Sequence, residues 1–239
     1  MTAGADDLKR AVSFAAVDRY VRDGACIGLG TGSTARWAIV RVGERVARGE
    51  SIVAVPTSAA TERECRDLGI PIAALGERQI DVAIDGADEV AADWALTKGG
   101  GGALFREKAV ALAAAAFVVV VTPEKLVARL GAFATPVEVV PFTVRTVARA
   151  IEAAHPAVLV GRRGAAGAPF VTDNGNAILD CSFGPIEDPL ALDISLRAIH
   201  GVVATGLFPS GLTSAVLVAG SGGVRALAEP HARRVYGPA

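Results

Sequence analysis

Four consecutive glycines stand between a lysine and a helix-forming segment in the sequence KGGGGALFREKAV (98–110). Glycine in regular structure costs about 0.5–1 kcal/mol relative to alanine, so such a run needs a reason. A glycine run before a helix leaves backbone N–H groups bare, and a ligand can lie against them. Together with the ammonium group of Lys98, these N–H groups suit negative charge that develops on an oxygen. The glycines concerned are Gly99, Gly100 and Gly101.

A glutamate follows one turn into the predicted helix 103–116. Glu107 shares a stripe of that helix with alanine, leucine and valine side chains at offsets of three and four. A carboxylate on the inward face of an alanine-rich helix is costly unless it has a partner or a task. A salt bridge is the simpler interpretation, but Arg106 is poorly aimed for one. We therefore favour a task in proton transfer for Glu107.

The segment GLGTGSTA (28–35) joins a predicted strand to a predicted helix. Its glycines and Ala35 fit the dinucleotide-binding pattern G-x-G-x-x-A. That site needs an acidic residue at the end of the next strand, whereas this strand ends with Thr57 and Ser58. Three hydroxyl groups beside a helix N-terminus instead favour a terminal phosphate. A capped, tight strand-to-helix turn is the alternative. The predicted phosphate-binding residues are Thr31, Gly32, Ser33 and Thr34.

Two aspartates follow a third predicted strand in the segment DGADEV (85–90). Ligands bind at this edge of open parallel sheets. The turn formed by Gly86 and Ala87 lets the carboxylates of Asp85 and Asp88 point the same way. Taken alone, ordinary turn chemistry accounts for Asp and Gly at such a place. A magnesium site is a further alternative, although no third acidic element is evident and the three histidines are scattered.

Together, these segments favour one type of reaction. A phosphate anchor would hold one end of a substrate, and a carboxylate would lie near a site for an oxyanion. Moving a proton between two carbons next to a carbonyl needs a base for the C–H bond and donors for the enediolate oxygen. Such a donor typically contributes ~2.7–4 kcal/mol. The reaction requires no redox cofactor.

Strands and helices alternate over the first half of the chain. Strands are predicted at 25–30, 51–58, 80–90 and 117–123, and helices at 6–21, 33–49, 59–69 and 103–116. This alternation predicts an α/β fold, with a Rossmann-like, mainly parallel sheet covered by helices on both faces. A strand at 214–220 is expected to return to the same sheet.

The pattern changes after about residue 131. A strand-like segment, a helix, a hairpin and a second helix are predicted at 135–142, 143–155, 157–183 and 188–201. This order suits a smaller α+β (ferredoxin-like) domain over 131–205, beside a catalytic domain formed by 1–130 and 206–239. We expect residues 161–169 to form a mobile tip away from the motifs, and residues 229–239 to be frayed.

Composition narrows the class of protein. The net charge of −1 argues against a non-specific nucleic-acid binder. Cys26, Cys65 and Cys181 form no CxxC pair and no disulfide framework, which suggests a reducing cytosol. The longest apolar stretch falls short of the ~20 residues of a spanning helix, and acidic residues replace the apolar run of a signal peptide. We expect a cytoplasmic protein with no membrane partner.

The combination of segments resembles the ribose-5-phosphate isomerase type A family. In the order and spacing of that family, the segments are GLGTGSTA, DGADEV, KGGGGALFREKAVA, PVEVVP, VTDNGNAILD and GVVATGLF. The resemblance extends from about Asp7 to Gly220. It implies interconversion of ribose 5-phosphate and ribulose 5-phosphate in the non-oxidative pentose phosphate pathway. It also implies an enediol mechanism without metal or cofactor, and a homodimer or homotetramer.

The resemblance also implies catalytic roles. Glu107 is similar to the general base of the family, which carries the proton between C1 and C2. Asp85 resembles the residue that assists ring opening and hydroxyl proton exchange, with Asp88 beside it on the sugar hydroxyls. Lys98 belongs with the oxyanion and sugar-contact loop.

The remaining implied residues bind the substrate. Lys125, in TPEKLV, matches a substrate-contacting lysine, and a solvated lysine at a helix start is the less favoured alternative. Lys9 lies where a phosphate-side lysine is expected. The other implied substrate contacts are Thr31, Gly32, Ser33, Thr34, Gly86, Ala87, Gly99, Gly100 and Gly101.

Two other functions remain open at this point. A sugar-phosphate sensor without catalytic activity can share the phosphate loop, but no basic helix-turn-helix segment stands out. A metal-dependent phosphatase could be built on Asp85 and Asp88, and would release phosphate in the presence of magnesium.

Overall fold

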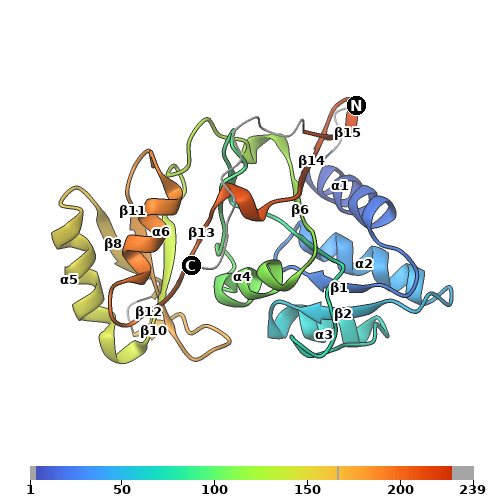
Figure 1. The fold of residues 1–239 in the computed structure, drawn as a ribbon, viewed down its shortest axis with the longest axis horizontal. Coiled ribbons are helices and arrows are strands. Elements are labelled where there is room, and N and C mark those ends of the chain that lie inside the picture. Colours follow the sequence, from blue (N-terminus) through green and yellow to red (C-terminus); the bar gives the residue numbers. More distant parts are fainter. Residues whose placement is uncertain (1–3, 166, 228–239) are drawn as a thin grey trace.

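The computed structural model describes residues 4–165 and 167–227, which form two lobes (Figure 1). The larger lobe contains a six-stranded sheet with the order β15-β14-β6-β3-β1-β2. Its neighbouring strands are parallel, except that β15 is antiparallel to β14. The strands are β1 (Cys26–Leu29), β2 (Val53–Pro56), β3 (Val82–Asp85), β6 (Phe117–Val121), β14 (Ala215–Gly220) and β15 (Gly223–Ala226).

Side-chain alternation explains why both faces of this sheet are covered. On β6, Val118 and Val120 join the core shared with α1, α2 and α3, whereas Phe117, Val119 and Val121 join the core shared with α4. Successive side chains of a strand point to opposite faces, so each apolar strand serves two cores. This confirms the predicted covered, mainly parallel sheet. The helices are α1 (Ala5–Tyr20), α2 (Ala35–Val46), α3 (Ala59–Asp67) and α4 (Leu104–Ala113).

The smaller lobe contains a four-stranded antiparallel sheet with the order β12-β7-β11-β8. Its chain order of strand, helix, strand, strand, helix, strand confirms the predicted ferredoxin-like arrangement. The elements are β7 (Thr135–Val139), α5 (Val144–Ala154), β8 (Leu159–Arg162), β11 (Ala177–Ser182), α6 (Pro189–Arg197) and β12 (Val202–Thr205). The domain limits at 130/131 and 205/206 stay a prediction.

The third predicted strand is shorter than expected. β3 ends at Asp85, and the DGAD turn carries the chain into a separate three-stranded sheet with the order β13-β5-β4. This small sheet lies between the two lobes in Figure 1. Its strands are β4 (Glu89–Val90), β5 (Leu96–Thr97) and β13 (Leu207–Phe208). Residues 229–239, which were predicted to be frayed, lie outside the described residues.

The segment between β8 and β11, part of which was predicted to be a mobile tip, contains a short antiparallel pair. Its strands are β9 (Gly164–Ala165) and β10 (Ala168–Pro169), and the mobility of the segment stays a prediction. Arg163 N–H donates to Ile178 O at 2.9 Å and Phe170 N–H donates to Arg163 O at 3.0 Å, so the base of this pair is tied to the sheet.

Candidate active site

A cleft of about 430 Å³ opens where the loops after β1, β3 and β6 meet. These loops follow the carboxyl ends of neighbouring parallel strands, where open α/β sheets bind ligands. All the site residues predicted from sequence line the cleft, with the exception of Asp85. Ala35 and Glu124 also line it and were not predicted.

Glu107 lies on the first turn of α4 and is 4% exposed. Its Oε2 is 3.4 Å from Lys98 Nζ, and no hydrogen bond from a described residue reaches this oxygen. Burial raises the pKa of Glu107 to about 8, with Lys98 opposing the rise and Asp85 and Asp88 adding to it. A carboxylate with a free oxygen and a pKa near neutrality can accept a proton from a ligand in the cleft.

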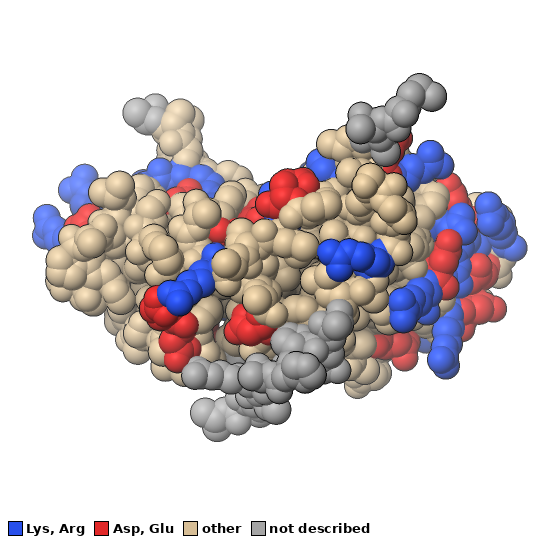
Figure 2. Space-filling model, turned by 90° about the horizontal axis from the view of Figure 1, so that it is seen from above, with Lys and Arg blue, Asp and Glu red and all other residues tan. Residues whose placement is uncertain are grey.

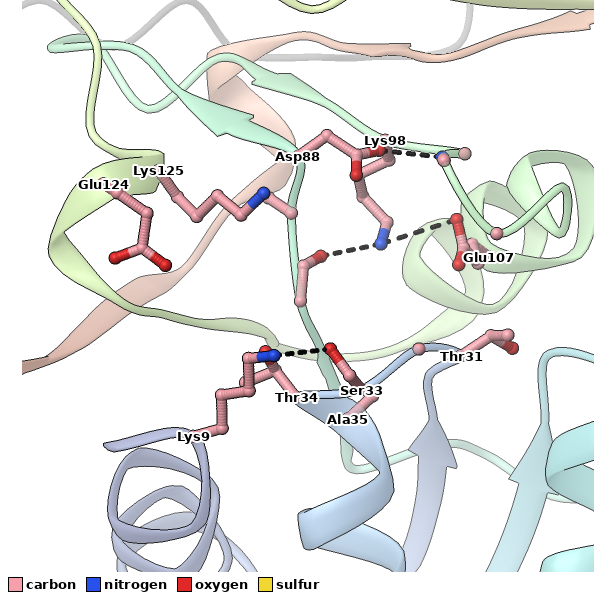
Figure 3. Close-up of a pocket in the computed structure, with 16 residues that line it drawn as sticks. Lys9, Thr31, Ser33, Thr34, Ala35, Asp88, Lys98, Glu107, Glu124 and Lys125 are labelled. Atoms are coloured by element: carbon pink, nitrogen blue, oxygen red, sulfur yellow. Dashed lines mark hydrogen bonds and ion pairs between the residues drawn. The ribbon is translucent and has the colours of Figure 1, made fainter. Parts of the chain in front are cut away.

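Lys98 directly follows β5, and its side chain points toward Glu107 (Figure 3). Its Nζ donates to Gly86 O at 2.7 Å and lies 2.9 Å from Asp85 Oδ2. Burial alone would lower the pKa of Lys98, but attraction from Asp85 and Glu107 outweighs it and raises that pKa. The lysine is therefore a buried ammonium group held beside the free oxygen of Glu107.

Asp85 lies beneath Lys98 and does not line the cleft. It ends β3, where all four residues are buried, and its Oδ1 accepts the Gly86 N–H at 2.7 Å. Burial raises the pKa of Asp85, while Lys98 and the N–H groups of Gly86 and Thr31 oppose that rise. In this structure its contact with a ligand would be through Lys98.

The glycine loop, residues 99–102, turns tightly before α4. Gly99 and Gly102 have φ values of 96° and 80°, which disfavour residues with a side chain. Gly100 N–H donates to Asp88 Oδ2 at 2.8 Å. The expectation that these N–H groups lack a protein partner is therefore wrong for Gly100, because Asp88 of the DGAD turn accepts its hydrogen bond.

The predicted phosphate loop presents two of its three hydroxyl groups toward the cleft (Figure 3). Ser33 Oγ accepts a hydrogen bond from Lys9 Nζ at 3.0 Å, which joins α1 to the start of α2. Thr31 differs: its hydroxyl contacts Thr57 and Ser58 at 2.8 Å, and Thr61 at 3.1 Å.

Lys125 and Glu124 form another wall of the cleft, on the 3-10 helix η1 (Pro123–Lys125) that follows β6. Glu124 accepts a hydrogen bond from Thr122, which lowers its pKa. No local pattern singles out Glu124, because in the TPEKLV segment only Lys125 matches a substrate-contacting residue of the family.

The segment expected to lie away from the motifs reaches the glycine loop. Arg163 donates to Gly99 O at 2.7 Å and to Gly100 O at 3.2 Å. The expectation for 161–169 is therefore wrong in this respect. The approach depends on the packing of Ile178 of β11 and Ala204 of β12 against Leu104 of α4, which no local sequence pattern specifies.

Two further observations concern the part of the chain that the structure describes. None of its groups of three or more His, Cys, Asp or Glu side chains could hold a metal ion. Over the same residues, no helix combines the length and the apolar character needed to cross a bilayer.

Figure 2 shows Lys and Arg side chains interspersed with Asp and Glu on one face of the molecule, so that face presents no continuous basic surface.

Comparison with known proteins gives consistent matches over most of the chain. A family model described as ribose 5-phosphate isomerase A (phosphoriboisomerase A) matches residues 53–223. A protein named ribose-5-phosphate isomerase A from Roseiflexus sp. (strain RS-1) is 46% identical, covering 96% of this chain and 99% of the relative. One of the same name from Methylorubrum extorquens is 47% identical, covering 91% and 94%.

Solved structures give the same result. Ribose 5-phosphate isomerase A from Methanocaldococcus jannaschii is 39% identical with a TM-score of 0.88, covering 94% of this chain and 99% of that chain. A D-ribose-5-phosphate isomerase in complex with phospho-erythronic acid is 36% identical with a TM-score of 0.89, over the same shares of 94% and 99%.

Proposed function

This chain belongs to the ribose 5-phosphate isomerase A family, and from that premise we propose how its cleft carries out the reaction. The protein is an aldose–ketose isomerase that interconverts D-ribose 5-phosphate and D-ribulose 5-phosphate. The observation that carries the mechanism is the free Oε2 of buried Glu107, held 3.4 Å from Lys98 in the same cleft as the phosphate loop.

The phosphate of the sugar binds at the start of α2. Lys9 supplies a positive charge, and Ser33 and Thr34 supply hydroxyl donors. The N-terminus of α2 adds backbone N–H groups and the positive end of the helix dipole. This end of the cleft fixes the position of the sugar chain relative to Glu107.

Glu107 accepts the proton from C2 of the open-chain aldose. The C2–H electrons form a C1–C2 double bond, and the aldehyde oxygen O1 takes the negative charge of an enediolate. O1 gains the proton of the O2 hydroxyl, Glu107 returns its proton to C1, and a ketone forms at C2. A positioned base of this kind contributes typically about 10²–10⁴-fold to the rate.

Lys98 and the glycine loop stabilise the enediolate. The ammonium group of Lys98 lies 3.4 Å from Glu107 Oε2 and lines the same cleft, and the Gly100 N–H donates to Asp88 Oδ2. A sugar oxygen takes the place of Asp88, which then contacts the hydroxyls and exchanges their protons during ring opening. Asp85 assists by holding Lys98 in its charged form.

The substitution Glu107→Gln tests the base. The variant keeps the shape of the side chain but cannot accept the C2 proton, so kcat falls by about 10²–10⁴-fold in a coupled assay of ribulose 5-phosphate formation. Binding of phospho-erythronic acid, measured by calorimetry, should persist because the phosphate end is untouched.

Glu187→Gln is a matched control, because Glu187 is an exposed residue of the smaller lobe. It should turn over at the rate of the unsubstituted protein. A Glu107→Gln variant with near-normal kcat contradicts the assignment of the base.

We extend the proposal to the setting of the reaction: the non-oxidative pentose phosphate pathway in the cytoplasm, with the protein as a homodimer or homotetramer. Apolar side chains that stay exposed on one chain support self-association, with Phe142 96% exposed and Leu159 75% exposed. Sedimentation of the purified protein checks the oligomer, and a single-chain mass contradicts it.

A further inference from the structure

Arg163 of the smaller lobe contacts the backbone of the glycine loop. The residue lies between β8 and β9, and its side chain is 16% exposed. Asp180 on β11 orients the guanidinium through two contacts: Nε donates to Oδ2 at 2.9 Å, and Nη2 donates to Oδ1. A guanidinium held in such a two-point contact has a fixed plane and a fixed direction for its remaining donors.

The remaining donor is directed at the glycine loop. Nη1 lies 2.7 Å from Gly99 O and 3.2 Å from Gly100 O. Each carbonyl shares its peptide unit with the N–H of the next residue, so these contacts act on the N–H groups of Gly100 and Gly101. A positive charge on a peptide oxygen polarises the unit and strengthens its N–H as a donor.

A second side chain of the same segment also holds the loop. The Phe170 ring lies 5.9 Å from the Arg163 guanidinium, and a Cβ added to Gly102 would meet Phe170 at 2.3 Å. Four consecutive glycines have high conformational freedom, so a loop of this composition needs restraint from outside. Arg163 and Phe170 supply that restraint from the smaller lobe.

We propose that Arg163 is a positioning residue for the isomerisation, which orients and polarises the peptide units whose N–H groups stabilise the enediolate. The inference rests on the proposed function, since it assigns a purpose to the glycine loop in that reaction. Arg163 acts through the backbone of the glycine loop and does not line the cleft itself. A role limited to joining the lobes would instead affect folding and all ligands alike.

The test compares Arg163→Ala with the unsubstituted protein in the isomerisation of ribose 5-phosphate. We expect kcat to fall at least ~10-fold, since an indirect loss should be smaller than that of a direct oxyanion donor. KM and the inhibition constant of inorganic phosphate should stay within ~3-fold, because the phosphate end is unchanged. The inhibition constant of phospho-erythronic acid should rise by a factor similar to the loss in kcat, because its carboxylate replaces the enediolate oxygens.

Two further variants complete the test. Arg163→Lys keeps the charge but not the planar fork, so it should restore only part of kcat, and it carries the test if Arg163→Ala does not fold. Arg162→Ala, at the neighbouring exposed position, should behave as the unsubstituted protein. Circular dichroism and thermal unfolding establish that each variant is folded.

Two results would overturn the inference. One is a kcat within ~2-fold of the original in both Arg163 variants, and the other is equal weakening of phosphate and phospho-erythronic acid. Both leave the proposed function intact. That function fails separately, if the unsubstituted protein does not turn over ribose 5-phosphate or if Glu107→Gln stays active.

Discussion

At the scale of single residues, the ionisation of Glu107 determines when the cleft can work. Burial raises its pKa to about 8, so near pH 7 a smaller share of the protein carries this side chain ionised than for an ordinary glutamate. A base must be deprotonated before it can accept a proton. The rate constant kcat/KM reports on the ligand-free protein and should therefore increase with pH through about 8.

The substitution Asp88→Asn tests this electrostatic account. Asp88 raises the pKa of Glu107, so its removal makes ionisation easier and moves the acid limb of the kcat/KM profile to lower pH. The height of the profile falls as well, because Asp88 lines the cleft. Asp67→Asn, an exposed position at the end of α3, should leave the limb in place. An unshifted limb in Asp88→Asn contradicts the account.

At the scale of elements, the sequence predicted the position of a site residue wherever a pattern lay along one face of a helix or at the end of a strand. The buried strand ends before GTGST and DGAD, and the alanine-rich stripe of Glu107, predicted the loops that meet at the cleft. The direction of the Thr31 hydroxyl could not be predicted, because it depends on where β2 places Thr57 and Ser58. The contact of Arg163 with Gly99 joins residues of different lobes and has no local pattern at all.

The close approach of β1 and β3 gives an element-scale prediction. A Cβ added at Gly30 would lie 2.0 Å from Asp85 Oδ1, so Gly30→Ala must displace the carboxylate that holds Lys98. Overpacking of this kind typically costs about 1–3 kcal/mol of stability, and the shift of Lys98 should also lower kcat. Thermal unfolding and the isomerase assay measure the two effects.

Gly161→Ala is the matched control, since a Cβ there meets no atom within 4 Å. It should retain both stability and kcat. A Gly30→Ala variant with normal turnover would show that Lys98 does not depend on the position of Asp85.

At the scale of the whole molecule, α4 connects the two lobes through adjacent residues. Glu107 faces the cleft, whereas Lys108 extends into the smaller lobe, where its Nζ donates to Asp193 Oδ1 at 3.1 Å. Asp193 on α6 is fully buried and also accepts from Arg197 at 2.9 Å. Burial lowers the pKa of Lys108, with Asp193 opposing that change.

The substitution Lys108→Met should destabilise the protein, because it removes one of the two positively charged side chains that contact buried Asp193 and leaves only Arg197. Breaking a buried ion pair on one side typically costs about 3–5 kcal/mol, and the remaining contact with Arg197 places this case at the low end. Chemical denaturation measures the loss. The double variant Lys108→Met/Asp193→Leu should recover much of it, since no buried charge is left unpaired. A single variant with unchanged stability contradicts this prediction.

Glu107 and Lys108 are adjacent on α4, and their side chains contact Lys98 and the smaller lobe respectively. A movement of the lobes away from each other would therefore change the distance between the Glu107 carboxylate and the phosphate-binding end of the cleft. We therefore predict that sugar enters and leaves by rearrangement of loops and side chains at the rim, with the two lobes moving as one body. Heating should then abolish turnover at the same temperature at which the smaller lobe loses its structure, even if the parallel sheet survives longer.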